Sequence, residues 1–173
     1  MSEFDFQAIS PKDVENAVKL IGDDWMLITA KDEKNGRVNA MTASWGCMGV
    51  LWNKPVCVCF IRPQRHSFSL VEREERISLA FLGDRYRDAL RLCGSKSGRD
   101  LDKLRAAGLR AVKIDGVDSI AEARLILICR KLYADDMKQD SFLDPSLLAN
   151  YPNGDFHRIY VLEIEGAYLR ETD

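Results

Sequence analysis

The sequence has no long apolar run and no strong excess of charge of either sign. Its longest apolar stretches, 56–61 and 125–129, are far shorter than the roughly 20 residues that a membrane-spanning helix needs. The formal net charge is only -2 over 173 residues, so no overall field favours nucleic acid or an anionic membrane surface. The first residues are acidic and mixed, unlike an export signal. We therefore expect a cytoplasmic protein that binds neither nucleic acid nor membrane.

The motifs of several enzyme classes are also missing. The chain has no HExxH, no GxGxxG, no Ser–His–acid spacing and no outstanding pair of carboxylates. Its five cysteines are odd in number, which argues against a disulfide framework. No second Cys/His pair accompanies Cys57 and Cys59, so we expect them to be small buried hydrophobes and expect no metal site. Any chemistry is then expected to come from a bound cofactor.

What the chain does contain is a dense run of donors at 95–103, which reads Ser-Lys-Ser-Gly-Arg-Asp-Leu-Asp-Lys. Gly98 would let backbone N–H groups converge on a small dianion. The following segment, 101–107, predicts a helix stopped by Gly108, with its N-terminus toward the same point. One interpretation is a phosphate clamp. The alternative is a solvated helix-capping loop with Ser97 or Asp100 as N-cap.

A second cationic cluster follows a buried strand and contains Arg62, Arg65, His66 and Ser67. Alone it is typical of a solvated loop, but two clusters of the same composition suggest one positive pocket. We expect that pocket to gather the side chains of Arg62, Arg65, Lys96, Arg99 and Lys103.

The segment 39–45, Asn-Ala-Met-Thr-Ala-Ser-Trp, combines small residues with hydrogen-bonding side chains. Small residues would let a flat ligand approach the backbone, although they also suit a strand packed under a helix. We expect Trp45 and Trp52 to be core or dimer-contact residues, with ligand stacking as the alternative. His157 opens the last strand and would donate to a substrate or exchange protons, unless it is simply a hydrogen-bonded strand-end histidine.

The pattern of elements predicts a mainly β fold, an antiparallel barrel with short helices attached. Asn35-Gly36 marks a hairpin, and Ser10-Pro11 opens a helix. We expect strands at 25–30, 37–44, 55–61, 76–82, 111–114, 123–133 and 156–168; helices at 11–22, 68–74, 86–92, 101–107 and 145–149; and a loop at 45–53.

These segments, in this order, resemble the flavin reductase-like, FMN-binding split-barrel family, and its flavoredoxin-like branch in particular. The resemblance covers roughly residues 20–170. It rests on the motifs 27–30, 39–45, 61–67, 97–103 and 154–161, and on the buried strand that contains Pro55 and Val56. One departure is the run Trp-Gly-Cys-Met-Gly at 45–49, which replaces the Pro/Ser-containing loop common in the family at the wall facing the second substrate.

The resemblance implies a single split-barrel domain over 1–173, with an N-terminal helical segment at 1–22, that forms a homodimer. It implies non-covalent FMN, with FAD as an alternative, and hydride transfer from NAD(P)H to the flavin, with oxygen, free flavin or an electron-acceptor protein receiving the electrons. The residues expected at the flavin ring and ribityl chain are Asn39, Thr42, Ala43, Ser44 and Trp45. Those expected at the phosphate are Arg62, Arg65, His66, Ser67, Ser97, Gly98, Arg99 and Lys103. His157 would be the catalytic residue beside the ring.

Two other functions stay open from the sequence. One is an FMN-containing electron-transfer protein of the flavoredoxin type, without its own nicotinamide site. The other is a binding module whose basic pocket holds a different phosphorylated ligand.

Overall fold

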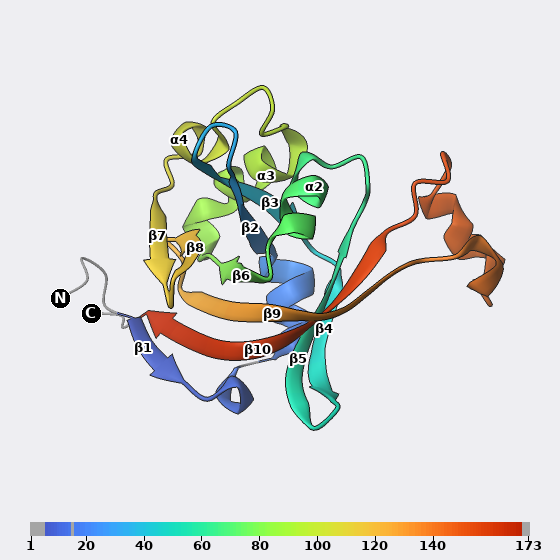
Figure 1. The fold of residues 1–173 in the computed structure, drawn as a ribbon, viewed down its shortest axis with the longest axis horizontal. Coiled ribbons are helices and arrows are strands. Elements are labelled where there is room, and N and C mark those ends of the chain that lie inside the picture. Colours follow the sequence, from blue (N-terminus) through green and yellow to red (C-terminus); the bar gives the residue numbers. More distant parts are fainter. Residues whose placement is uncertain (1–5, 15, 171–173) are drawn as a thin grey trace.

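The computed structural model describes residues 6–14 and 16–170. Its main feature is an eight-stranded antiparallel sheet in the order β3-β2-β6-β9-β10-β5-β4, with β1 paired to β10 (Figure 1). The strands are β1 (Phe6–Ile9), β2 (Met26–Asp32), β3 (Arg37–Ala43), β4 (Gly46–Leu51), β5 (Lys54–Ile61), β6 (Arg76–Phe81), β9 (Leu125–Asp136) and β10 (Arg158–Arg170). The antiparallel barrel with short helices expected from the sequence is confirmed.

Helices cover one end of the sheet and lie near β3 (Figure 1). They are α2 (His66–Arg73), α3 (Arg87–Ser95) and α4 (Lys103–Ala106), with a small β7 (Ala111–Ile114) and β8 (Val117–Ile120) hairpin beside them. The partner strand β8 was not predicted. It follows a turn in which Asp115 and Gly116 both have positive φ, 52° and 77°.

The core has two layers because the central strand β9 is buried on both faces. Leu125, Leu127 and Cys129 join one cluster, and Ile126 and Ile128 join the other. Alternate residues of a strand point to opposite faces, so a continuous apolar run is what such a strand requires. The first cluster also contains Cys57 and Cys59, both fully buried as expected, and burial raises the pKa of both thiols.

The β4–β5 hairpin corrects the expected loop at 45–53. Gly46 pairs with Cys59, and its backbone lies so close to Val58 that an added Cβ would sit 2.8 Å from the Val58 carbonyl oxygen. Glycine here serves close strand packing rather than a turn. The turn is Trp52-Asn53, with φ of 51° and 56°. Trp52 is 56% exposed, which excludes it from the core.

The two helices predicted at 11–22 and 101–107 are shorter or interrupted in the structure. The helix expected at 11–22 is divided into a 3-10 turn (Pro11–Asp13), a short α1 (Ala17–Lys19) and a π-helical segment (Leu20–Asp24), and β1 precedes them as a strand. The expected helix at 101–107 is reduced to α4, and its N-cap is Asp102, whose carboxylate accepts from the N–H of Arg105. Ser97 and Asp100 are therefore not the cap.

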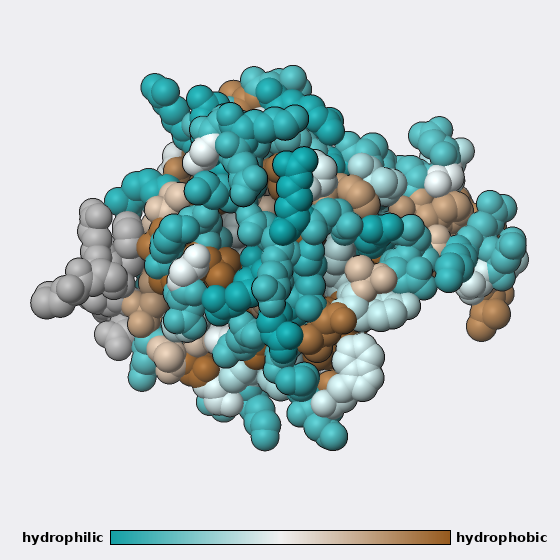
Figure 2. Space-filling view, in the orientation of Figure 1, coloured by the Kyte–Doolittle hydropathy of each residue, from teal (hydrophilic) through white to brown (hydrophobic). Residues whose placement is uncertain are grey.

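Beyond the sheet, β9 and β10 continue into an arm formed by residues 137–157, which projects from the body (Figure 1). It contains two 3-10 turns, Gln139–Ser141 and Pro145–Asn150. Most of the face seen in Figure 2 is hydrophilic, with apolar atoms at the far end of the arm. Within the arm, Leu143 is fully exposed. Across the described residues, no helix has the length and apolar character to cross a membrane.

Candidate functional site

A cleft of about 420 Å³ opens where β3 ends, beside the end of β5 and the start of β10. The end of β3 and the residues after it form one wall, and the loop after β5 forms another. Of the residues predicted from the sequence, the cleft is lined by Thr42, Ala43, Ser44, Trp45, Arg62, Arg65 and His157. Met41, Phe60 and Gln64 also line it and were not predicted. A second hollow of about 410 Å³ adjoins the cleft through Thr42 and Ser44.

The two basic motifs meet at the C-terminus of α3. Arg65 Nη2 donates to the carbonyl oxygen of Gly94 at 2.6 Å, and Lys103 Nζ donates to that of Cys93 at 3.1 Å. Lys103 is only 5% exposed. Burial, with Arg65 nearby, lowers the pKa of Lys103 to about 8. Within the part of the chain that the structure describes, neither cation pairs with a carboxylate. Helix carbonyls alone offset their charge.

A packed polar seam beside β3 contains Asn39, which was predicted at the flavin ring and ribityl chain, and His66, Ser67 and Gly98, which were predicted at the phosphate. Asn39 Nδ2 donates to Ser67 Oγ at 2.7 Å, and His66 Nε2 lies 3.2 Å from Asp32 Oδ2. Gly98 packs against this seam, since an added Cβ would sit 2.1 Å from Asn39 Oδ1. The structure thus brings these residues next to one another, but they do not line the cleft.

The loop that follows α3 carries the remaining donors. Ser97 Oγ accepts from the N–H of Arg99 at 3.2 Å, while the side chains of Lys96 and Arg99 are exposed. The loop continues directly from the helix end held by Arg65 and Lys103. Neither the loop nor Lys103 lines the cleft, and Gly98 and Lys103 instead border a narrow separate hollow beside Asn39. A phosphate role for Ser97, Gly98, Arg99 and Lys103 stays a prediction.

Arg62 has a structural task that the sequence did not reveal. Its guanidinium donates to Asp155 Oδ2 at 2.6 Å and to the carbonyl oxygen of Asn150 at 2.8 Å. It also lies over the ring of Tyr151, 5.2 Å from the centroid. Gln64 donates to the same Asp155 oxygen. Arg62 therefore fastens the arm to the end of β5 while it lines the cleft.

His157 lies where the arm meets β10. Its Nδ1 is 2.8 Å from the hydroxyl of Tyr151, and its ring is 5.3 Å from that of Trp45. Burial, together with the nearby Arg62, lowers the pKa of His157 to about 4. The imidazole is therefore neutral near neutral pH, where it can donate or accept a hydrogen bond but is a poor source of protons. Trp45, which is 48% exposed, is not a core residue.

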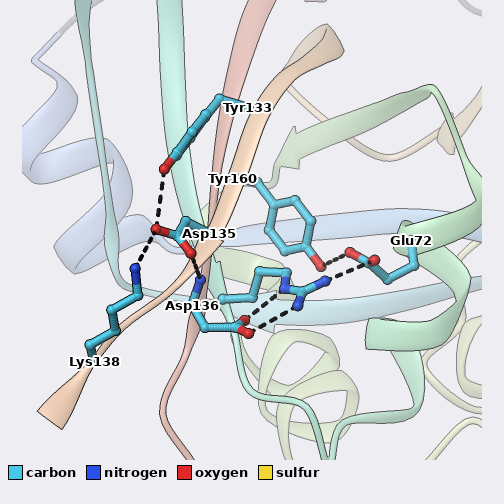
Figure 3. Close-up of polar contacts among 7 residues, drawn as sticks. Glu72, Tyr133, Asp135, Asp136, Lys138 and Tyr160 are labelled. Carbon is cyan, nitrogen blue, oxygen red and sulfur yellow. Dashed lines mark hydrogen bonds and ion pairs between the residues drawn. The ribbon is translucent and has the colours of Figure 1, made fainter.

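A network of charges at the base of the arm fixes the backbone next to His157 (Figure 3). Arg158 donates to both carboxylate oxygens of Asp136, at 2.7 and 3.0 Å, and to Glu72 at 3.0 Å. Tyr160 donates to the other Glu72 oxygen at 2.5 Å, and burial, assisted by Glu72, raises the pKa of this tyrosine. The network joins β9, β10 and α2, so the start of β10, next to His157, and the helix that follows Arg65 are held together.

No arrangement of three or more His, Cys, Asp or Glu side chains within residues 6–14 and 16–170 is suited to a metal ion. The residues that sequence reasoning missed, Tyr151 and Asp155 above all, belong to the arm. Their roles depend on contacts with Arg62 that span 89 and 93 positions of sequence, and no local motif reports such contacts.

Comparison with known proteins agrees with this architecture. A family model described as the flavin reductase like domain matches residues 19–173. The match covers most of the chain, so the chain belongs to the flavin reductase-like family, and the resemblance seen in its motifs is confirmed.

Solved structures share the fold. An FMN-binding domain of a flavin reductases-like enzyme from Shewanella baltica OS155 has 18% sequence identity and a TM-score of 0.70, covering 98% of this chain and 80% of its own. Flavoredoxin from Methanosarcina acetivorans has 20% identity and a TM-score of 0.65, covering 86% and 69%. The styrene monooxygenase flavin reductase from Pseudomonas putida S12 has 13% identity and a TM-score of 0.65, covering 86% and 80%. No curated protein matches the chain.

Proposed function

We propose that this chain binds FMN in the cleft and acts as an NAD(P)H-dependent flavin reductase. The observation that carries the proposal is the pair Arg65 and Lys103. Arg65 lines the cleft, Lys103 is buried at the same end of α3, and neither has a carboxylate partner among the residues described. A buried cation without a counter-charge is costly, and an incoming phosphate would offset that cost.

The donor set fits FMN in two further respects. Ala43 and Ser44 present little side-chain bulk on one wall, so a flat ring can approach the backbone there. Trp45 and Phe60 provide aromatic surface in the same cleft, and a flavin ring can pack against such surface. FMN carries one phosphate, which suits one basic end. FAD stays the alternative ligand.

In this proposal Arg65, Lys103, Ser97 and Arg99 hold the phosphate, and 42–45 positions the ring. FMN, when bound, supplies the hydride-accepting chemistry. The chain itself supplies orientation: Arg62 keeps the arm against the cleft, and neutral His157 offers a hydrogen bond beside the ring. The absence of an acid–base constellation in the sequence is consistent with that division of work.

The test begins with apo-protein titrated with FMN and with FAD, followed by absorbance. Stopped-flow mixing of the FMN complex with NADH and with NADPH then measures bleaching of the flavin. The proposal predicts saturable FMN binding and rapid bleaching by at least one nucleotide. Absence of binding contradicts the whole proposal.

A second function, an electron carrier like flavoredoxin, is favoured by the shared fold with the Methanosarcina acetivorans protein. It predicts tight FMN that neither nucleotide bleaches but that a reduced protein donor does. Replacing His157 by Ala distinguishes the flavin reductase from the electron carrier in a second way. A reductase loses turnover much more than FMN affinity, whereas a carrier without a nicotinamide site loses neither.

We also propose that the chain forms a homodimer through the β4–β5 hairpin. β4 is an edge strand, and Val50, Leu51 and Trp52 are exposed on it or at its turn. An exposed apolar edge of this kind is typical of an interface. Sedimentation equilibrium of wild type and of Trp52→Arg tests this: the variant is expected to shift toward monomer, and a monomeric wild type contradicts the proposal.

A further inference from the structure

Tyr151 reaches His157 from the arm. The tyrosine is 8% exposed and the histidine 7%. The hydroxyl lies 2.8 Å from Nδ1, a normal hydrogen-bond length, and 3.4 Å from the sulfur of Met137. Phe142 and Phe156 pack around the tyrosine ring at 5.8 and 4.9 Å between centroids.

The hydroxyl has one proton and two acceptors to choose from. An imidazole nitrogen is a far stronger acceptor than a thioether sulfur, so the proton is expected on the line to Nδ1. Burial raises the pKa of Tyr151, which keeps that proton on the oxygen. If Nδ1 accepts, the single ring proton of the neutral imidazole must sit on Nε2.

Nε2 has no hydrogen-bond partner in the described part of the chain. It is nevertheless not buried: Asp155 Oδ1 is the one buried side-chain nitrogen or oxygen without a partner among the described residues. Nε2 therefore reaches solvent, and the residue lines the cleft. A neutral N–H at this place can only donate, so it selects an acceptor atom, such as a carbonyl oxygen, on the molecule in the cleft.

We propose that Tyr151 is a positioning residue that fixes His157 as the neutral Nε2–H tautomer and so makes it a hydrogen-bond donor in the cleft. Arg62 secures the tyrosine by lying over its ring and by binding the carbonyl oxygen of its neighbour Asn150. The kinetic consequence rests on the proposed reductase function. The tautomer itself does not, because it is a property of the free protein.

The primary test is nitrogen NMR of the imidazole rings in the free, full-length chain. The chain has two histidines, so the His66→Gln variant assigns the His157 signals. Wild type is expected to show a pyrrole-like Nε2 and a pyridine-like Nδ1. Tyr151→Phe removes only the hydroxyl, and the Nδ1 signal is then expected to move toward a mixture of tautomers.

Two matched variants make the result specific. Tyr133→Phe removes a hydroxyl from another tyrosine, one bonded to Asp135 (Figure 3), and is expected to leave the His157 signals unchanged. Met137→Leu removes the competing sulfur and is likewise expected to leave them unchanged. A protonated Nδ1 in wild type, or identical spectra for Tyr151→Phe and wild type, overturns the proposal.

The secondary test uses the FMN-loaded protein. Tyr151→Phe is expected to lower kcat/KM for NAD(P)H by roughly five- to tenfold, the effect of losing one well-placed hydrogen bond, with FMN affinity unchanged. Thermal melting of the same variants controls for folding. If wild type shows no nucleotide oxidation, the proposed reductase function fails while the NMR result still decides the role of Tyr151. A normal kcat/KM in Tyr151→Phe, with an active wild type, contradicts the catalytic consequence.

Discussion

The buried Lys103 makes a prediction about stability that requires no cofactor. In the unfolded chain this amine has its ordinary pKa of 10.5, and in the folded protein burial lowers it to about 8. Between these values the unfolded state holds a proton that the folded state does not, so the free energy of unfolding rises with pH. Burial of the charged amine therefore lowers the free energy of unfolding by about 3 kcal/mol at any pH below about 8, where both states hold the proton. Unfolding experiments are practical only over part of this pH range. From about pH 7 to about pH 9.5 the free energy of unfolding should rise by about 2 kcal/mol.

Replacing Lys103 by Met tests this value, because methionine fills the space without the charge. Methionine cannot donate to the carbonyl oxygen of Cys93, which costs about 1–3 kcal/mol, but that cost is independent of pH. Urea unfolding therefore measures the free energy of unfolding of apo wild type and of Lys103→Met at each pH in this range, and the difference between the two proteins is followed as pH rises. Wild type should gain about 2 kcal/mol relative to the variant as pH rises. The exposed Lys96→Met serves as control and should run parallel to wild type. Parallel curves for Lys103→Met would refute the buried, charged amine.

Three further predictions follow from other contacts. FMN affinity should weaken as pH rises above about 8, because a bound phosphate favours the protonated form of Lys103. An FMN affinity that calorimetry finds independent of pH argues against contact between Lys103 and the phosphate. Arg62→Ala removes the ion pair to Asp155 and should make the arm at 137–157 much more sensitive to limited proteolysis. Cleavage of the variant only outside the arm would contradict this prediction. Of the five cysteines only Cys47 is exposed, so one thiol per chain should react quickly with an aromatic disulfide reagent, and Cys47→Ser should abolish that phase.

The sheet was predictable wherever a strand carries its own pattern. The apolar run of β9 requires burial on both faces, and Asn35-Gly36 specifies the β2–β3 turn. β4 was missed because Gly46 and Gly49 read as loop residues. The close approach to Val58 that requires Gly46 exists only once the strands have paired.

The candidate site was predictable in part, for a related reason. The segment at 42–45 and the motif containing Arg62 and Arg65 are local, and the fold brings them to one cleft. The sequence could not show that Arg62 is committed to the arm or that Lys103 is buried. Both properties arise from packing between segments far apart in the chain.

The central claim is that the basic end of the cleft holds the phosphate of FMN. Calorimetric titration of the apo-protein with FMN and with riboflavin, which lacks the phosphate, tests it most directly. Each charge-assisted hydrogen bond to the phosphate is worth about 1.5–3 kcal/mol, so FMN should bind at least tenfold more tightly than riboflavin. Arg99→Ala should reduce this difference in affinity between the two flavins. Equal affinities for the two flavins, or no binding of either, would contradict the account.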